Sequence, residues 1–124
     1  MNTPIIFISL NRIKDGKADS FREHYRESQM RTQAEKPDTS VQLAYENEAI
    51  TEVTVIRLLP DADALDAQIH GVDQRSKKTY EFIEPTAIEI FGKPNAATIE
   101  RMKLVAGSGI MVSIHPNFIG GFVR

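Results

Sequence analysis

The sequence predicts an α+β fold in which an antiparallel sheet carries helices on one face. Segments rich in β-branched and aromatic residues alternate with amphipathic helical segments in the order strand, helix, strand, strand, helix, strand. The strand candidates 4–14 and 51–60 are apolar on both sides, so helices on one face leave the other face to be covered by something else. With 124 residues, 41% of them hydrophobic, the chain fits one globular domain.

The first half of the chain predicts a strand, a long helix and a hairpin. Strand 4–14 ends at a turn in which Asp15 is expected to cap a helix from 17 to 35. The segment 41–46 alternates as a half-buried strand, and its connection to 51–60 is too short for a parallel crossover, so the two form a hairpin. The inner stripe of the helix follows three- and four-residue steps through Ala18, Phe21, Tyr25, Ser28 and Thr32.

The second half predicts two further helical segments and the last strand of a ferredoxin-like sheet. Asp61 caps a helix that carries Leu65 and Ile69 inward. A second helical stretch, 73–84, carries Tyr80 and Ile83 inward until a proline ends it, and strand 86–92 follows. Right-handed crossovers then give four antiparallel strands with helices on one face.

The last thirty residues predict an extension of the same domain. Segment 95–106 is expected to be a helix and 110–115 a strand, followed by an irregular tail, 116–124. The apolar strand and tail predict that the strand pairs with an open sheet edge, its own or a partner's, and that the tail is exchanged between protomers. We therefore expect one domain over 1–124, with a core at 4–94 and an extension at 95–124.

Composition excludes several functional classes. A net charge of −2 provides no basic field, so neither nucleic acid nor an anionic membrane is an expected partner. The chain has no cysteine, which excludes disulfides and thiolate catalysis and suits the cytoplasm. No apolar run approaches the roughly 18 residues of a membrane helix. Histidine pairs at metal spacing, phosphate loops and dinucleotide motifs are also missing, so no metal or cofactor is expected.

Four local patterns resemble those of a known family. They are Asp15-Gly16-Lys17 before a helix with Phe21, Glu52-Val53-Thr54-Val55, the helix entry Pro60-Asp61-Ala62-Asp63-Ala64-Leu65, and Ile88-Glu89-Ile90-Phe91-Gly92-Lys93-Pro94. In these patterns the chain resembles the antibiotic-biosynthesis-monooxygenase-like family of the dimeric α+β barrel superfamily. The resemblance implies a homodimer in which two sheets face each other. It also implies that a small aromatic or quinone-like compound is oxidised without a cofactor, through an anion that reduces oxygen directly.

Other functions remain open beside the monooxygenase. The same dimer could bind a small hydrophobic molecule without catalysis, as a stress-response protein does. Haem degradation is disfavoured because the chain has no tryptophan, and because the functional asparagine of haem-degrading relatives would fall nearer Ser9 than Asn11. The residues themselves support a dimer if Ile5, Phe7, Val53 and Val55 are the face without a covering layer.

The candidate site lies on the first strand. Phe7, Ser9 and Asn11 share one side and mix apolar with polar groups, as ligand sites do. Asn11 is a poor strand former and is the first catalytic candidate, as a donor to a developing anion. The alternative is that Asn11 bonds to nearby loop backbone.

Four more residues complete the expected site. His70 is the second catalytic candidate, as a base, although it could instead cap a helix end. Arg57 either anchors an anionic substrate or pairs with a carboxylate such as Glu89. Tyr25 and Tyr80 are assigned to substrate binding, with core or interface packing as the alternative. His24 and His115 are expected at a solvated edge and a strand end.

Overall fold

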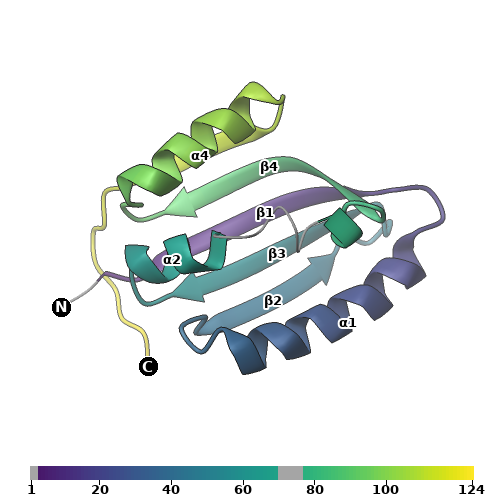
Figure 1. Cartoon of the computed structure of the whole chain (residues 1–124), viewed down its shortest axis with the longest axis horizontal. Helices are drawn as coiled ribbons and strands as arrows, with labels where there is room; N and C mark the ends of the chain where they lie inside the picture. The colour runs from purple at the N-terminus through teal and green to yellow at the C-terminus, as the bar shows by residue number, and fades with distance from the viewer. Residues whose placement is uncertain (1–2, 70–76) are drawn as a thin grey trace.

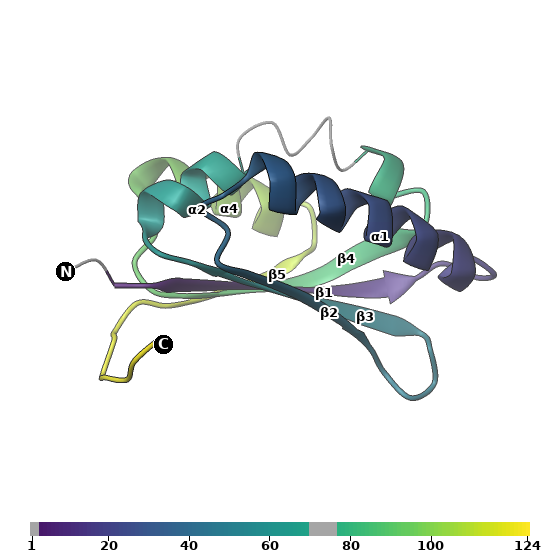
Figure 2. The ribbon, with the colours of Figure 1, turned by 90° about the horizontal axis from the view of Figure 1, so that it is seen from below.

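A computed structural model, which describes residues 3–69 and 77–124, confirms the α+β ferredoxin-like fold. Helices cover one face of a single five-stranded sheet (Figures 1 and 2). The elements are β1 Ile5–Ile13, α1 Ala18–Glu35, β2 Val41–Glu46, β3 Glu52–Leu59, α2 Ala62–Ile69, β4 Ile83–Phe91, α4 Ala96–Gly107 and β5 Met111–His115.

The strands lie in the order β2-β3-β1-β4-β5, with β1 in the centre (Figure 1). β2 and β3 form the predicted hairpin, and β1 is antiparallel to both β3 and β4. β5 pairs with β4 in parallel, because α4 carries the chain back across the sheet between them. The fifth strand therefore covers an open edge of its own sheet, one of the two outcomes expected from its apolar sequence.

The helix-covered face holds the hydrophobic core. Strand alternation turns Ile5, Phe7 and Leu59 toward the helices, where Leu65 of α2 and Met102 of α4 pack against them. Leu59 and Leu65 are completely buried. A second group, around Phe21 of α1, fills the other end of the same face with Ile13, Val53 and Ile83.

The opposite face of the sheet carries apolar side chains without a covering layer. We call it the open face; no helix of the described residues lies on it (Figure 2). Its three cross-strand rows are Val41-Leu58-Ile6-Phe91-His115, Leu43-Ile56-Ile8-Glu89-Ser113 and Tyr45-Thr54-Leu10-Ala87-Met111. Leu43 and Tyr45 are 46% and 60% exposed. Most members of these rows are large and apolar.

This arrangement corrects the expected assignment of the two faces. Ile5, Phe7, Val53 and Val55 were considered as the face that lacks a covering layer, but they are buried under the helices. Alternation shows that both faces are apolar, whereas the helix crossovers decide which face is covered. The expectation that one apolar face remains uncovered holds for the other set of residues.

The start of β4 also differs from the expectation. Residues 77–79 are helical, residues 73–76 lie outside the described ranges, and Ile83, expected on a helix, is the first residue of β4. Pro85 lies within this strand, opposite Asn11, before the pairing with β5 begins. A proline lacks an N–H and is tolerated at such an edge position. The register of β1 against β4 shifts here, between Leu10 and Asn11.

A smaller difference concerns the start of α1. The residue before α1 is Lys17, which makes no capping bond with its side chain, so the expected cap at Asp15 is wrong. The chain turns at Gly16, whose positive φ of 73° favours glycine. The tail 116–124 is irregular, as predicted, and runs on the open-face side of the sheet (Figure 2).

Candidate functional site

A cavity of about 360 Å³ lies between the sheet and its helices. This helix-side cavity is within the roughly 300–1,000 Å³ range of small-molecule sites. Its floor is the covered face of β1, β3 and β4, and α1 and α4 supply side chains from above. Six of the seven residues expected at the site line it: Phe7, Ser9, Asn11, Tyr25, Arg57 and Tyr80.

Cross-strand register brings the floor residues together. Phe7 lies beside Arg57, and Ser9 lies between Val55 on β3 and Ile88 on β4. The side chains of these pairs point to the same side of the sheet, since residues directly opposite in a ladder share a face. The floor is therefore mainly apolar, with a few fixed polar groups.

Asn11 is buried at the register shift of β1 and is 4% exposed. Its amide nitrogen donates to the Ser9 carbonyl at 3.2 Å, to Ser9 Oγ at 3.3 Å and to the Val53 carbonyl at 3.3 Å. The side chain therefore bonds mainly to strand backbone while it lines the cavity. The backbone bonding resembles the alternative to a catalytic role, although the acceptors lie in strands and not in a loop.

Arg57 and Tyr25 form a polar cluster at the β2 side of the cavity. Arg57 Nε donates to Gln42 Oε1 at 3.0 Å. Arg57 cannot pair with Glu89, because Glu89 belongs to the open face and Arg57 lines the cavity on the other side. The ion pair with Glu89 is therefore wrong, and the anchoring role of Arg57 stays a prediction.

The hydroxyl of Tyr25 is buried and has no hydrogen-bond partner among the described residues. Burial raises the pKa of Tyr25, while nearby Gln42 and the positive charge of Arg57 act in the opposite direction. Gln42 approaches the hydroxyl without a hydrogen bond of normal geometry. A buried phenol ordinarily finds a partner, so this hydroxyl is suited to meet a ligand.

The rim near the turn before β4 carries a histidine that was expected at a solvated edge. His24 Nε2 lies 2.7 Å from Thr79 Oγ1, and its ring lies 5.3 Å from the ring of Phe82. Burial, with the positive charges of Arg31 and Lys78, lowers the pKa of His24 below its usual value. His24 is therefore a partly buried lining residue with a preference for the neutral form.

The remaining expected site residues are placed less centrally. Tyr80 lies in a turn at the cavity rim and is 46% exposed, not on the inner side of a helix. His70 lies outside the described residues. His115 ends β5, as expected, and stacks on Phe91 with ring centres 4.5 Å apart on the open face. No group of three or more histidine or carboxylate side chains in the described ranges could hold a metal ion.

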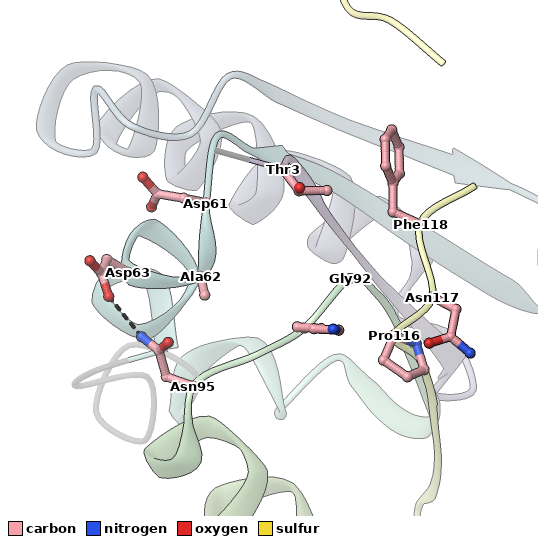
Figure 3. Close-up of a pocket in the computed structure, with 10 residues that line it drawn as sticks. Thr3, Asp61, Ala62, Asp63, Gly92, Asn95, Pro116, Asn117 and Phe118 are labelled. Atoms are coloured by element: carbon pink, nitrogen blue, oxygen red, sulfur yellow. Dashed lines mark hydrogen bonds between the residues drawn. The ribbon is translucent and has the colours of Figure 1, made fainter. Parts of the chain in front are cut away.

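A second hollow of about 640 Å³ lies where α2 and α4 begin, beside the tail (Figure 3). Three of its polar side chains, Asp61, Asp63 and Asn95, form hydrogen bonds at the helix starts. Asp61 Oδ1 accepts from the Ala64 backbone N–H at 2.8 Å, and Asn95 Nδ2 donates to Asp63 Oδ1 at 2.8 Å (Figure 3). Since Asp61 caps α2 and Asn95 links the starts of the two helices, these side chains serve the fold, and the helix-side cavity is the stronger candidate site.

Comparison with known proteins confirms the fold. No protein-family model and no curated protein sequence matches the chain. Among solved structures, MupZ from Pseudomonas fluorescens is similar with a TM-score of 0.75 and 13% identity, covering 99% of this chain and 96% of that one. A putative antibiotic biosynthesis monooxygenase from Bacteriodes thetaiotaomicron VPI-5482 has a TM-score of 0.57 and 14% identity, covering 65% of this chain and 80% of its own.

A third similar structure is a putative monooxygenase from Lactobacillus acidophilus NCFM, with a TM-score of 0.60 and 13% identity. It covers 73% of this chain, which in turn covers 43% of it. The chain thus has the α+β ferredoxin-like fold of antibiotic-biosynthesis-monooxygenase-like proteins, as the local sequence patterns indicated. MupZ matches almost the whole chain, so its similarity extends over α4 and β5.

Sequence reasoning missed several lining residues, among them Gln42, Gln68 and Arg101. Gln42 lies on a half-buried strand whose other side, with Val41, Leu43 and Tyr45, is the more apolar one. The signal was available in the hairpin: pairing β2 with β3 puts Gln42 opposite Arg57. Arg101 comes from α4, in the extension, where nothing in the sequence pointed to the cavity.

Proposed function

We propose that the protein is a cofactor-independent monooxygenase that holds a small aromatic or quinone-like compound in the helix-side cavity. The observation that carries this proposal is the buried Tyr25 hydroxyl, without a described partner, in a largely apolar cavity. Such a donor stabilises a phenolate or enolate as it forms. Two of the structurally similar proteins are named as putative monooxygenases, which supports the reaction class.

In the proposed reaction the substrate supplies the electrons. Loss of a phenolic proton gives an electron-rich anion, which reduces O₂ directly. Where the oxidised carbon starts as CH₂ it becomes C=O, one oxygen atom is retained and the other leaves as water. We assign Asn11 and His70 to the catalytic groups: Asn11 would exchange one of its 3.3 Å contacts for the anion, and His70 would accept the proton.

An oxygen electrode and a panel of phenols and quinols test the reaction on metal-free protein. We expect substrate-dependent uptake, and a roughly ten- to thousandfold loss of turnover in Asn11→Ala, the effect of losing one preorganised donor. Tyr25→Phe should also lower the rate, whereas Tyr45→Phe, which removes an exposed hydroxyl from the open face, is the matched control. An unchanged rate in Asn11→Ala would assign that residue to strand structure alone.

A non-catalytic module that binds a hydrophobic small molecule is the second candidate. It is favoured by Asn11, whose amide nitrogen already has acceptors within the protein. The described cavity lining also contains no carboxylate that could act as a base. Saturable binding of the same phenols without oxygen uptake would favour this module over the enzyme.

We also propose that two copies of the chain pair through their open faces. Support comes from the three largely apolar rows that no described helix covers. Soluble monomers rarely leave a contiguous apolar patch of this kind exposed. Sedimentation should find a dimer at micromolar concentration, and a monodisperse monomer would contradict the proposal. We further propose that the tail reaches the partner, since its side of the sheet is the open one (Figure 2).

A further inference from the structure

We propose that the helix-side cavity selects ligands that carry a carboxylate, held at one end by Arg57 and Tyr25 while an apolar body lies over Phe7 and Val55. This inference rests on the proposed function, because it names the ligand class for the same cavity. The first observation is the charge of the cavity lining. Arg57 and Arg101 both line the cavity, whereas none of the described lining residues is an aspartate or glutamate.

The polar end of the cavity is already oriented for an anion. Arg57 is half-buried on β3, and its Nε donates to Gln42 Oε1 at 3.0 Å, which helps to orient the guanidinium. A guanidinium has five N–H donors, so it can hold a protein partner and a ligand oxygen at the same time. Its planar fork matches a carboxylate better than it matches a single phenolic oxygen.

Tyr25 adds a neutral donor at the same end. Its hydroxyl is buried without a hydrogen-bond partner among the described residues, and it lies close enough to Arg57 to experience that charge. A ligand carboxylate could accept from both groups. A neutral amide of the same shape offers one carbonyl oxygen and brings two N–H donors, which would face the donors of the protein.

The rest of the cavity determines the size and character of the ligand body. Phe7 lies beside Arg57 across the ladder, and Val55 and Ile88 continue the floor away from it. Met102 and Val105 of α4 line the cavity as well. A volume of about 360 Å³ accommodates a compound of one or two rings with one acidic group.

The test compares 2-naphthoate with 2-naphthamide, which have the same ring system and differ in charge. Isothermal titration calorimetry on the full chain at low salt should show the acid binding roughly ten- to hundredfold more tightly than the amide, the scale of one charge-assisted contact. Arg57→Met should abolish the preference for the acid, and Arg57→Lys should retain only part of that preference. Arg26→Gln, on the exposed side of α1, is the matched control and should leave it unchanged.

Each outcome decides the inference separately from the proposed function. Equal binding of acid and amide by the unaltered protein would overturn the carboxylate preference without contradicting a monooxygenase of neutral phenols. Binding of neither compound would overturn it as well, whereas oxygen uptake would still test the reaction independently. A preference for the acid together with no oxygen uptake on any substrate would support the ligand class and reject the monooxygenase. The ratio in the unaltered protein does not depend on whether a variant folds.

Discussion

The two faces of the sheet use the same strands for different purposes. On the helix-covered face, Leu59 and Val53 are buried among side chains of the same chain. On the open face, Ile56 and Leu58 of the same strand are only partly buried, in rows whose members are mostly apolar. The difference shows that hydrophobic content alone does not identify the core: the covered face stabilises the monomer, and the open face is available to stabilise an assembly.

The largest expected effect comes from the covered face. Leu59→Ala removes a completely buried side chain and leaves a cavity beneath α2. We expect the free energy of unfolding to fall by about 2–5 kcal/mol, measured by chemical denaturation monitored by circular dichroism. Leu104→Ala is the control, because Leu104 is 74% exposed and should change stability by less than about 0.5 kcal/mol. Equal effects of the two substitutions would contradict the assignment of the covered face.

The next effect tests the open face. Ile56→Glu places a charge between Leu43 and Ile8 in the middle row of that face. Burying it against a partner would weaken dimerisation by roughly a hundred- to several-thousandfold, since an unpaired buried charge costs about 3–5 kcal/mol. Sedimentation velocity should find monomers with an unchanged circular dichroism spectrum. Ala34→Glu adds the same charge to an exposed position of α1 and should leave the dimer intact.

A smaller effect is expected from the tail. Removing residues 116–124 takes away Phe118, Ile119 and Phe122, all of them exposed in the single chain. If these side chains pack on a partner, the dimer dissociation constant should rise roughly tenfold, which corresponds to about 1.4 kcal/mol. The melting temperature should also fall by a few degrees. Replacing both phenylalanines by serine in the full chain should reproduce most of the change, and a truncated chain with unchanged affinity would contradict it.

The smallest expected effect is on the pH dependence of stability, through His24 at the rim of the helix-side cavity. Because the folded protein lowers the pKa of His24, the unfolded chain binds a proton there more readily. The stabilisation from neutral His24 is complete above the ordinary pKa of about 6.5 and is lost as pH falls through the lower folded value. In His24→Gln the drop in denaturation midpoint from pH 8 to pH 5 should be smaller than in the unaltered protein. An identical drop would show that His24 does not couple folding to pH.

Much of the fold could be predicted from the sequence because it rests on local patterns. The helix stripe through Phe21 and Tyr25, the hairpin and the fifth strand all follow from periodicity and turn residues. The start of β4 could not be predicted, because a proline normally ends a helix or strand. Pro85 is accommodated within β4, at the register shift against β1. Which sheet face the helices cover depends on crossovers, which strand alternation does not encode.

The candidate site was predictable only where it lies on one strand. Phe7, Ser9 and Asn11 share a side by alternation, so finding one suggested the others. Gln42 and Arg101 reach the cavity through pairing and through packing of α4, which are tertiary relations. Arg57 was expected as an anchor, and the predicted hairpin already places β2 beside it, but the register that sets Gln42 opposite Arg57 comes from the structure.

The central position of β1 affects how the chain folds. β1 is synthesised before its neighbours β3 and β4, which lie much later in the sequence. Until they are available, a strand that is apolar on both faces has no ladder to join, and such non-local pairing is slow. The apolar side chains of β1 therefore stay exposed until β3 and β4 are available. Refolding yields are expected to fall steeply with protein concentration.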